Sequence, residues 1–324
     1  MMTLAIVGSS LCVSALGAWL LLPQLRAAGM VGRDMNKPNR PEVPEMGGLA
    51  LVAGFGAGVL LAVALEAFVP SLLPVDFTAL LAVLGTVLLT TLVGVVDDLL
   101  GMGQWVKAFL PLLASLPLVA IRAGQVTMTI PFLGQVDFGL LYPLVLVPIG
   151  VTGAANAANM LAGFNGLELG VGLVAMGSLA GIAAGLGQMT ALALLLAGLG
   201  AGLGLLVFNW YPARVFVGDV GTLSIGAILA TACIVGDMEL AGVIVIVPYG
   251  VDFLLKAVHR FPSRGWWGEL GDDGKLRCPA HGPVSLPQLV MKLAGGITER
   301  ALVGVLVGIE LVCGLGAVAL YLWR

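Results

Sequence analysis

Two adjacent carboxylates stand where the third long apolar run of the chain ends. Asp97 and Asp98 directly follow the apolar residues 77–96, so both lie at the C-terminal end of a predicted helix. Carboxylates there oppose the helix dipole and repel each other, an arrangement that makes sense where a cation binds or a proton is moved. Lys107 follows nine residues after Asp98, near the next apolar run. The simpler alternative is a pair of solvated acids at a helix end.

A second polar group lies between the fifth and sixth apolar runs. Asn156 and Asn159 are three residues apart and therefore share a helix face, and Asn165-Gly166 then predicts a turn. With Glu168 these amides form an oxygen-rich group that has no basic residue, which suits a hard cation or a nucleobase edge. Amides that hold packed helices together are the alternative.

Three further polar segments are predicted on the same side of the membrane. Residues 36–48 are rich in proline and contain Glu45 shortly before a pair of glycines. Asp219 opens an apolar run, and a cap on the predicted helix is the simpler interpretation of this acid. The polar segment 258–299 contains Arg277 and His281, for which a solvated surface is the alternative. Together the five segments supply hard oxygen donors and a few cations but no Cys/His set, the donor chemistry of a Mg²⁺–diphosphate site.

The elements that must position these groups are membrane helices. Apolar side chains make up 59% of the 324 residues and charged ones only 10%, where roughly 25% charged residues are usual in a soluble domain. This composition excludes a soluble globular enzyme and a disordered chain. A net charge of −3 without a charged block excludes a nucleic-acid partner. The four cysteines are widely spaced and include no C-x-x-C, so neither a zinc site nor a disulfide framework is indicated.

We predict an all-α polytopic membrane protein with about ten transmembrane helices in a single integral membrane domain over residues 1–324. The first apolar run lacks a basic start and is as long as a span, so we expect a retained helix. Alternation around Pro131 predicts a small β-hairpin outside the bilayer, and 258–299 is a long cytoplasmic loop between the ninth and tenth helices. The glycine-rich run 198–204 lies inside a span and predicts close helix packing. The ten predicted spans are residues 3–22, 47–69, 77–96, 108–121, 140–158, 167–187, 189–208, 219–236, 240–257 and 300–322.

The basic residues predict the orientation of these spans. With ten spans, 13 of the 15 Lys and Arg residues fall on connections of one side, and only Arg122 and Arg324 fall on the other. Because basic loops stay cytoplasmic, the polar groups above are expected on the cytoplasmic face and both termini outside.

The order and spacing of the motifs resemble those of a known family. Asn156-x-x-Asn159-x-x-x-Gly163-x-Asn165-Gly166-Leu167-Glu168 and Arg214-Val215-Phe216-Val217-Gly218-Asp219 are similar to motifs of the polyprenyl-phosphate N-acetylhexosamine-1-phosphate transferases. They look most like the dolichyl-phosphate GlcNAc-phosphotransferase branch of eukaryotes and archaea, and a chain of this size suits an archaeal-type member. The resemblance runs from about residue 33 to residue 283.

The resemblance implies an activity and its partners. It implies Mg²⁺-dependent transfer (with Mn²⁺ as an alternative ion) of GlcNAc-1-phosphate, or a related HexNAc-1-phosphate, from a UDP-sugar to a polyprenyl or dolichyl phosphate. UMP is released, and the product is the lipid-diphosphate-sugar of the first membrane step of glycan assembly. The expected partners are both substrates and the lipid bilayer, with a homodimer among the open oligomeric states.

The resemblance also implies a role for each matching residue. Asp219 and Asn159 would hold Mg²⁺, Asp97 and Asp98 would lie beside it with one of them as base, and Lys107 would neutralise phosphate charge. Gly163 and Asn165 would contact uracil, Phe216 would stack on it, and Glu45 and His281 would face the sugar. Relatives of the dolichol type carry Arg-His-Arg beside Cys-Pro, but here Cys278-Pro279 leads into Ala280-His281-Gly282. Two cations are therefore absent, and Lys275 or Arg277 is the hypothetical substitute.

Two alternatives stay open from the sequence. A bacterial-type undecaprenyl-phosphate sugar-phosphate transferase would use the same groups on another lipid and sugar. A transporter of nucleotide sugars or anions is the alternative of another class, because Glu310 lies midway through the last span and an intramembrane acid is a candidate functional residue. Transporters, however, place polar groups near the membrane midplane, whereas most polar groups here lie at one set of helix ends.

Overall fold

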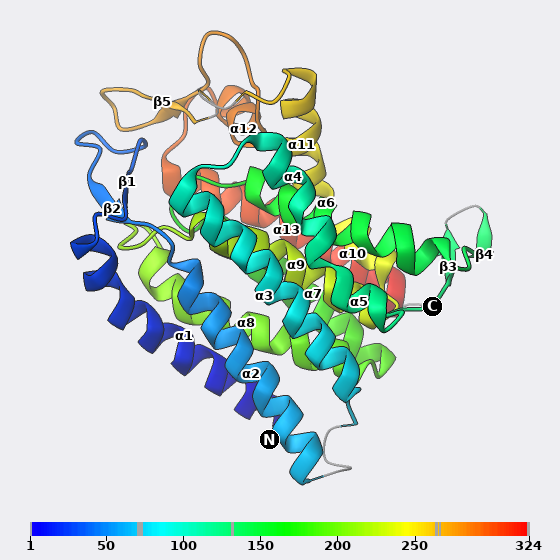
Figure 1. The fold of residues 1–324 in the computed structure, drawn as a ribbon. Coiled ribbons are helices and arrows are strands. Elements are labelled where there is room, and N and C mark those ends of the chain that lie inside the picture. The colour runs from blue at the N-terminus through cyan, green and yellow to red at the C-terminus, as the bar shows by residue number, and fades with distance from the viewer. Residues whose placement is uncertain (1, 70–73, 131–132, 263–264, 266, 323–324) are drawn as a thin grey trace.

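Long apolar helices lie side by side and form the body of the molecule (Figure 1). The structure, a computed structural model, describes residues 2–69, 74–130, 133–262, 265 and 267–322. The helices are α1 (Met2–Ala27), α2 (Gly48–Phe68), α3 (Phe77–Leu100), α4 (Gln104–Ala114), α5 (Leu116–Ala120), the π-helical turn η1 (Tyr142–Leu146), α6 (Val147–Met160), α7 (Leu167–Leu186), α8 (Met189–Asn209), α9 (Gly218–Val235), α10 (Glu239–Val245), α11 (Val247–Val258), α12 (Leu286–Ala294) and α13 (Glu299–Leu322).

Within the described residues, eight helical segments are long and apolar enough to cross a bilayer: α1, α2, α3, η1 with α6, α7, α8, α9 and α13. A ninth span results if α10 and α11 count as one, although they are bent by 59° where Pro248 begins the second helix. The predicted span 108–121 is instead a shorter apolar segment that breaks at Ser115, just before Pro117. The polytopic membrane architecture is thus confirmed, and the count of ten is not.

Small residues allow the helices to approach closely. A Cβ atom at Gly204 of α8 would lie 2.6 Å from the carbonyl oxygen of Leu11 in α1, and one at Gly54 of α2 would lie 2.5 Å from that of Ser10. These positions have no room for a larger side chain. Close van der Waals packing of this kind, between small residues, holds helices together in lipid. The predicted packing role of the 198–204 run is confirmed.

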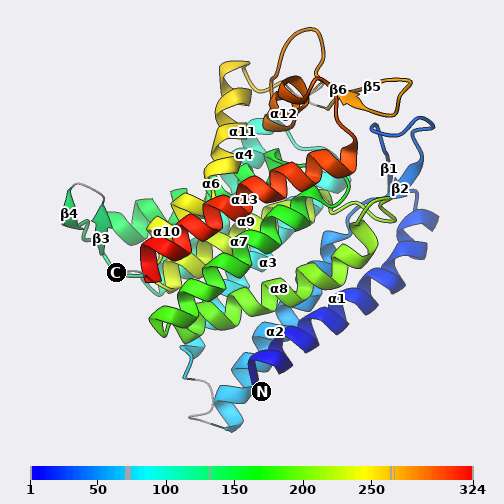
Figure 2. The ribbon, with the colours of Figure 1, turned by 180° about the vertical axis from the view of Figure 1, so that it is seen from behind.

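Short hairpins mark the two ends of the bundle (Figures 1 and 2). At one end lie β1 (Val31–Arg33) with β2 (Glu42–Pro44) and β5 (Glu269–Leu270) with β6 (Leu276–Arg277), both antiparallel pairs. At the other end β3 (Thr127–Ile130) pairs with β4 (Gly134–Asp137), which confirms the predicted hairpin, while Pro131 and Phe132 lie outside the described residues. The start of α1 and the end of α13 lie at this second end.

Candidate active site

Asp97, Asp98 and Asp219 meet where the end of α3 packs against the start of α9. The two helices touch backbone to backbone, since a Cβ atom at Gly94 would lie 2.5 Å from Cα of Val220. Gly94 precedes the two aspartates by about one helical turn, so this contact brings both carboxylates to the first turn of α9. The three aspartates that the sequence singled out therefore belong to one group, which we call the carboxylate cluster together with Glu45, described below.

Lys107 joins two of these carboxylates. Its Nζ lies 2.6 Å from Oδ2 of Asp97 and forms an ion pair with Oδ2 of Asp219. It reaches them because Gly101, with a left-handed φ of +64°, ends α3 and lets α4 turn back. Burial by itself lowers the pKa of Lys107, but the Asp219 charge and the hydrogen bonds to Asp219 and Asp97 outweigh it and hold the pKa above its ordinary value. Lys107 is therefore the charged partner of the cluster at neutral pH.

The two asparagines of α6 have different partners. Asn159 donates from Nδ2 to Oδ1 of Asp219 at 2.6 Å and to Oγ1 of Thr222 at 2.8 Å, so it belongs to the cluster. Asn156 donates to the carbonyl oxygen of Ala108 at 3.0 Å and so ties α4 to α6. For Asn156 the structure thus favours the packing role.

Asp98 caps α9 from outside that helix. Its Oδ1 accepts the backbone N–H of Asp219 at 3.0 Å and its Oδ2 that of Val220 at 3.1 Å. These N–H groups belong to the first turn, where no carbonyl of the helix can pair with them and where a negative charge is favourable. The capping role that a lone acid at position 219 predicts is therefore filled by Asp98. Asp219 is left to face Lys107 and Asn159 instead.

Glu45 and Phe216 are held next to the cluster by one short backbone ladder. The N–H of Phe216 donates to the carbonyl of Pro44, and the N–H of Gly47 donates to the carbonyl of Phe216, both at 2.8 Å. Burial, and then the negative charge of Asp219, raise the pKa of Glu45. Glu45 is thus close enough to Asp219 to feel its charge.

Sequence reasoning missed a second, buried polar group, the Lys37 cluster, formed by Asp34, Lys37, Asn165 and Glu299. Lys37 Nζ lies 3.2 Å from Oδ2 of Asp34, 3.3 Å from Oδ1 of Asn165, and in an ion pair with Glu299. Asn165 also donates its side-chain amide to Asp34 at 3.0 Å and its backbone N–H to Glu299 at 2.8 Å. Asn165 is only 3% exposed, so the structure holds it inside a network, and its contact with uracil stays a prediction.

Gly163 lies at the exposed edge of this network. Its carbonyl accepts from Nδ2 of Asn36 at 2.9 Å, and its N–H donates to Oε1 of Glu168 at 2.7 Å. The left-handed φ of +104° at Gly163 allows the chain to turn here between α6 and α7. Glu168 therefore closes the turn, while the role of Gly163 in base binding is untested.

The structure does not bring Arg277 or His281 to the carboxylate cluster. Arg277 is exposed and donates to both oxygens of Asp273, at 2.9 Å and 2.7 Å. The hydrogen bond from Arg277 is the main reason why the pKa of Asp273 falls to about 2. His281 is also exposed and donates from Nδ1 to the carbonyl of Gly282 at 2.9 Å. Their roles in sugar or diphosphate binding remain predictions.

The carboxylate cluster has more negative than positive charge. Among the described residues its four carboxylates have one cation, Lys107, which pairs with Asp97 and Asp219, and α6 supplies the amide of Asn159 as a further oxygen-bearing group. In the described part of the chain no three Asp, Glu, His or Cys side chains already converge on one metal position. The donor set of hard, negatively charged oxygens nevertheless fits Mg²⁺, with Asp219 and its hydrogen-bonded partner Asn159 as the groups that would hold it and Asp97 beside them across Lys107.

Comparisons with known proteins indicate the family of the chain. Residues 80–237 match the model of glycosyl transferase family 4. A protein of Saccharolobus solfataricus, named as a candidate UDP-N-acetylglucosamine–dolichyl-phosphate N-acetylglucosaminephosphotransferase, is 35% identical over 93% of this chain and 91% of its own length. The enzyme of that name from Dictyostelium discoideum is 26% identical, over 85% of this chain and 77% of its own. A phospho-N-acetylmuramoyl-pentapeptide-transferase of Shouchella clausii is 34% identical over 62% of this chain and 63% of its own length.

Proposed function

Because the chain belongs to glycosyl transferase family 4, we propose that it transfers GlcNAc-1-phosphate from UDP-GlcNAc to a polyprenyl phosphate of the dolichyl type and releases UMP. The donor and the acceptor are taken from the names of its relatives in Saccharolobus and Dictyostelium. The observation that carries the proposal is that Lys107 pairs with both Asp97 and Asp219. Lys107 lies on α4, whose other face is apolar and exposed.

That other face belongs to α4 and suits a lipid acceptor. Trp105 and Phe109 stack with ring centroids 6.2 Å apart and are 76% and 56% exposed. Lys107 lies between them in sequence and, two residues along the helix, projects to the opposite side, toward the carboxylates. A polyprenyl chain on the outer face of α4 would leave its phosphate within reach of Lys107. In this way a membrane-bound acceptor and a water-soluble donor can meet at one helix end.

The reaction joins two anions, so charge neutralisation is its main requirement. An oxygen of the lipid phosphate attacks the β-phosphorus of the UDP-sugar, the bond from that phosphorus to the bridging oxygen of UMP breaks, and UMP leaves with the electron pair. Lys107 neutralises phosphate charge on the attacking side. Bound Mg²⁺, with Asp219 and Asn159 as ligands, would supply the remaining positive charge on the diphosphate.

Of the two adjacent aspartates, Asp97 is the better candidate for a base. Both oxygens of Asp98 already accept backbone N–H groups of α9, whereas Oδ2 of Asp97 faces Lys107. We therefore assign to Asp97 Oδ2 the removal of a proton from a singly ionised lipid phosphate. The proposal keeps the orientation predicted from the basic residues, with the carboxylate cluster at the cytoplasmic face and both termini outside.

The test is a UMP-release assay on purified protein with a polyprenyl phosphate and Mg²⁺, repeated with Mn²⁺ and with a chelator. UDP-GlcNAc, UDP-GalNAc and the UDP-muramoyl-pentapeptide are compared directly, and we expect UMP from UDP-GlcNAc. Faster release from the pentapeptide donor with undecaprenyl phosphate would favour the bacterial-type enzyme instead. No UMP from any donor, together with nucleotide-sugar flux in proteoliposomes without polyprenyl phosphate, would contradict the enzyme and favour a transporter.

A further inference from the structure

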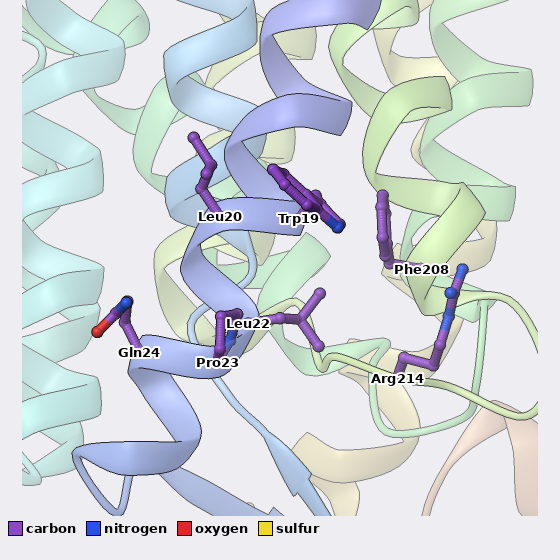
Figure 3. Close-up of a pocket in the computed structure, with 7 residues that line it drawn as sticks. All are labelled: Trp19, Leu20, Leu22, Pro23, Gln24, Phe208 and Arg214. Atoms are coloured by element: carbon purple, nitrogen blue, oxygen red, sulfur yellow. The ribbon is translucent and has the colours of Figure 1, made fainter.

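A shallow groove between α1 and α8 lies apart from the carboxylate cluster (Figure 3). It has a volume of about 410 Å³, and no residue of the cluster lines it. Figure 3 shows Trp19 of α1 facing Phe208 of α8 and the Arg214 side chain across the gap. The lining residues used below are Trp19, Leu20, Leu22, Pro23, Phe208 and Arg214.

Arg214 gives the groove a positive charge that no carboxylate of the described residues neutralises. Its Nη2 donates to the carbonyl oxygen of Val207 at 2.8 Å, and its guanidinium lies 4.7 Å from the centroid of the Phe208 ring. Both partners are neutral, and the side chain forms no ion pair in the part of the chain that the structure describes. The guanidinium is thus oriented by its neighbours and keeps free donors.

The groove is polar at one end and apolar at the other, along the direction of the bilayer normal. Arg214 lies five residues beyond Asn209, where α8, one of the candidate spans, ends. Trp19 and Leu20 lie seven or eight residues before the end of α1, about 10–12 Å deeper at the helical rise, and are 63% and 52% exposed. This is the polarity of a membrane lipid, with the headgroup at the boundary and the chain toward the middle.

We propose that the groove binds one anionic phospholipid of the surrounding bilayer. Its phosphate would pair with the Arg214 guanidinium, and its chain would lie between Trp19 and Phe208. A guanidinium pairs with a lipid phosphate through parallel hydrogen bonds. The charge of Arg214 favours an anionic headgroup over a zwitterionic one, because the zwitterionic headgroup carries its own cation, which offsets the phosphate charge. A bulk lipid fits better than the acceptor lipid, since Asp97, Lys107 and Asp219 are absent from the lining.

The experiment is native mass spectrometry of the full-length protein titrated with phosphatidylglycerol or phosphatidylcholine. We expect the wild type to bind one phosphatidylglycerol in preference, and Arg214→Gln to bind it about 10- to 100-fold more weakly, as the loss of a charge-assisted contact predicts. Arg26→Gln is the matched control, since Arg26 is an exposed arginine at the end of α1 that does not line the groove. Arg214→Lys should retain part of the preference.

A second measurement locates the lipid. Brominated phosphatidylglycerol should quench tryptophan fluorescence more than brominated phosphatidylcholine, and the difference should disappear in Trp19→Phe as well as in Arg214→Gln. Equal binding of the two lipids by the wild type, or a preference that Arg214→Gln leaves intact, would overturn the proposal. Displacement of phosphatidylglycerol by a tenfold lower amount of polyprenyl phosphate would assign the groove to the acceptor, and cross-linking of two copies through position 19 would assign it to a homodimer.

Discussion

Asp98→Asn separates two roles of the adjacent aspartates. In the wild type both side-chain oxygens of Asp98 accept N–H groups of the first turn of α9, from Asp219 and Val220. Asparagine keeps one acceptor oxygen and turns an N–H₂ group toward the other N–H, so one hydrogen bond is lost and a backbone donor is left without a partner. Because that donor belongs to Asp219 or its neighbour, we expect Asp219 to move away from Lys107.

The size of the effect follows from these two contacts. A hydrogen bond to a charged group is worth about 1.5–3 kcal/mol and an unsatisfied buried donor costs about 1–3 kcal/mol. A total of about 2.5–6 kcal/mol, if it falls on the transition state, lowers turnover by roughly 10²- to 10⁴-fold at 1.36 kcal/mol per factor of ten.

The assay is UMP release by purified protein, with melting temperature measured in parallel. Asp219→Asn is the companion variant, because it leaves the Asp98 cap in place and removes only the charge that faces Lys107 and Asn159. We expect both variants to lose turnover and Asp98→Asn to lose more stability, because Asp219→Asn keeps the cap on α9 and the pair of Lys107 with Asp97. Near-normal turnover of folded Asp98→Asn would refute the argument that the cap positions Asp219.

Three other predictions follow from single contacts. Because the pKa of Lys107 is raised in the folded protein, its ion pairs contribute stability that is complete below about pH 10, the ordinary pKa of lysine, and is lost as pH rises through the folded value. Lys107→Met should therefore have a lower melting temperature than the wild type at pH 7, and its melting temperature should fall less between pH 9 and 11. An equal fall of the two melting temperatures over that range would contradict this. Lys256 pairs with buried Asp252 at 2.8 Å and donates to the carbonyl of Met160, next to Asn159. Lys256→Met should therefore cost about 3–5 kcal/mol of stability and change kcat by a larger factor than the KM for UDP-GlcNAc, with partial rescue by Lys256→Arg. A change in KM alone would argue against a positioning role. Arg277→Ala should change that KM by no more than about threefold, as expected for an exposed ion pair, and a tenfold rise would return Arg277 to the substrate site.

The sequence predicted best those features that depend on composition and local pattern. Apolar runs gave eight of the spans, alternation gave the β3–β4 hairpin, and helix-end acids gave the carboxylate cluster. The Lys37 cluster was not foreseen because Glu299 is 262 residues from Lys37, and nothing local signals such a pair. The cap on α9 was not foreseen for the same reason, since Asp98 reaches it through a helix–helix contact between residues 121 positions apart.

The predicted span 108–121, which is a shorter apolar segment in the structure, points to how the cluster balances its charge. Three aspartates at one junction repel one another, and each is offset differently: Asp98 by the N-terminal end of α9, and Asp97 and Asp219 by Lys107. Lys107 can do this only because α4 starts three residues after Gly101 and follows the end of α3 closely, held to α6 by Asn156. A helix with a cation on its inner face and Trp105 and Phe109 exposed on its outer face has the pattern of a helix at the membrane boundary rather than of a span. Its amphipathic character is thus what lets one short helix face both a lipid and an anionic nucleotide.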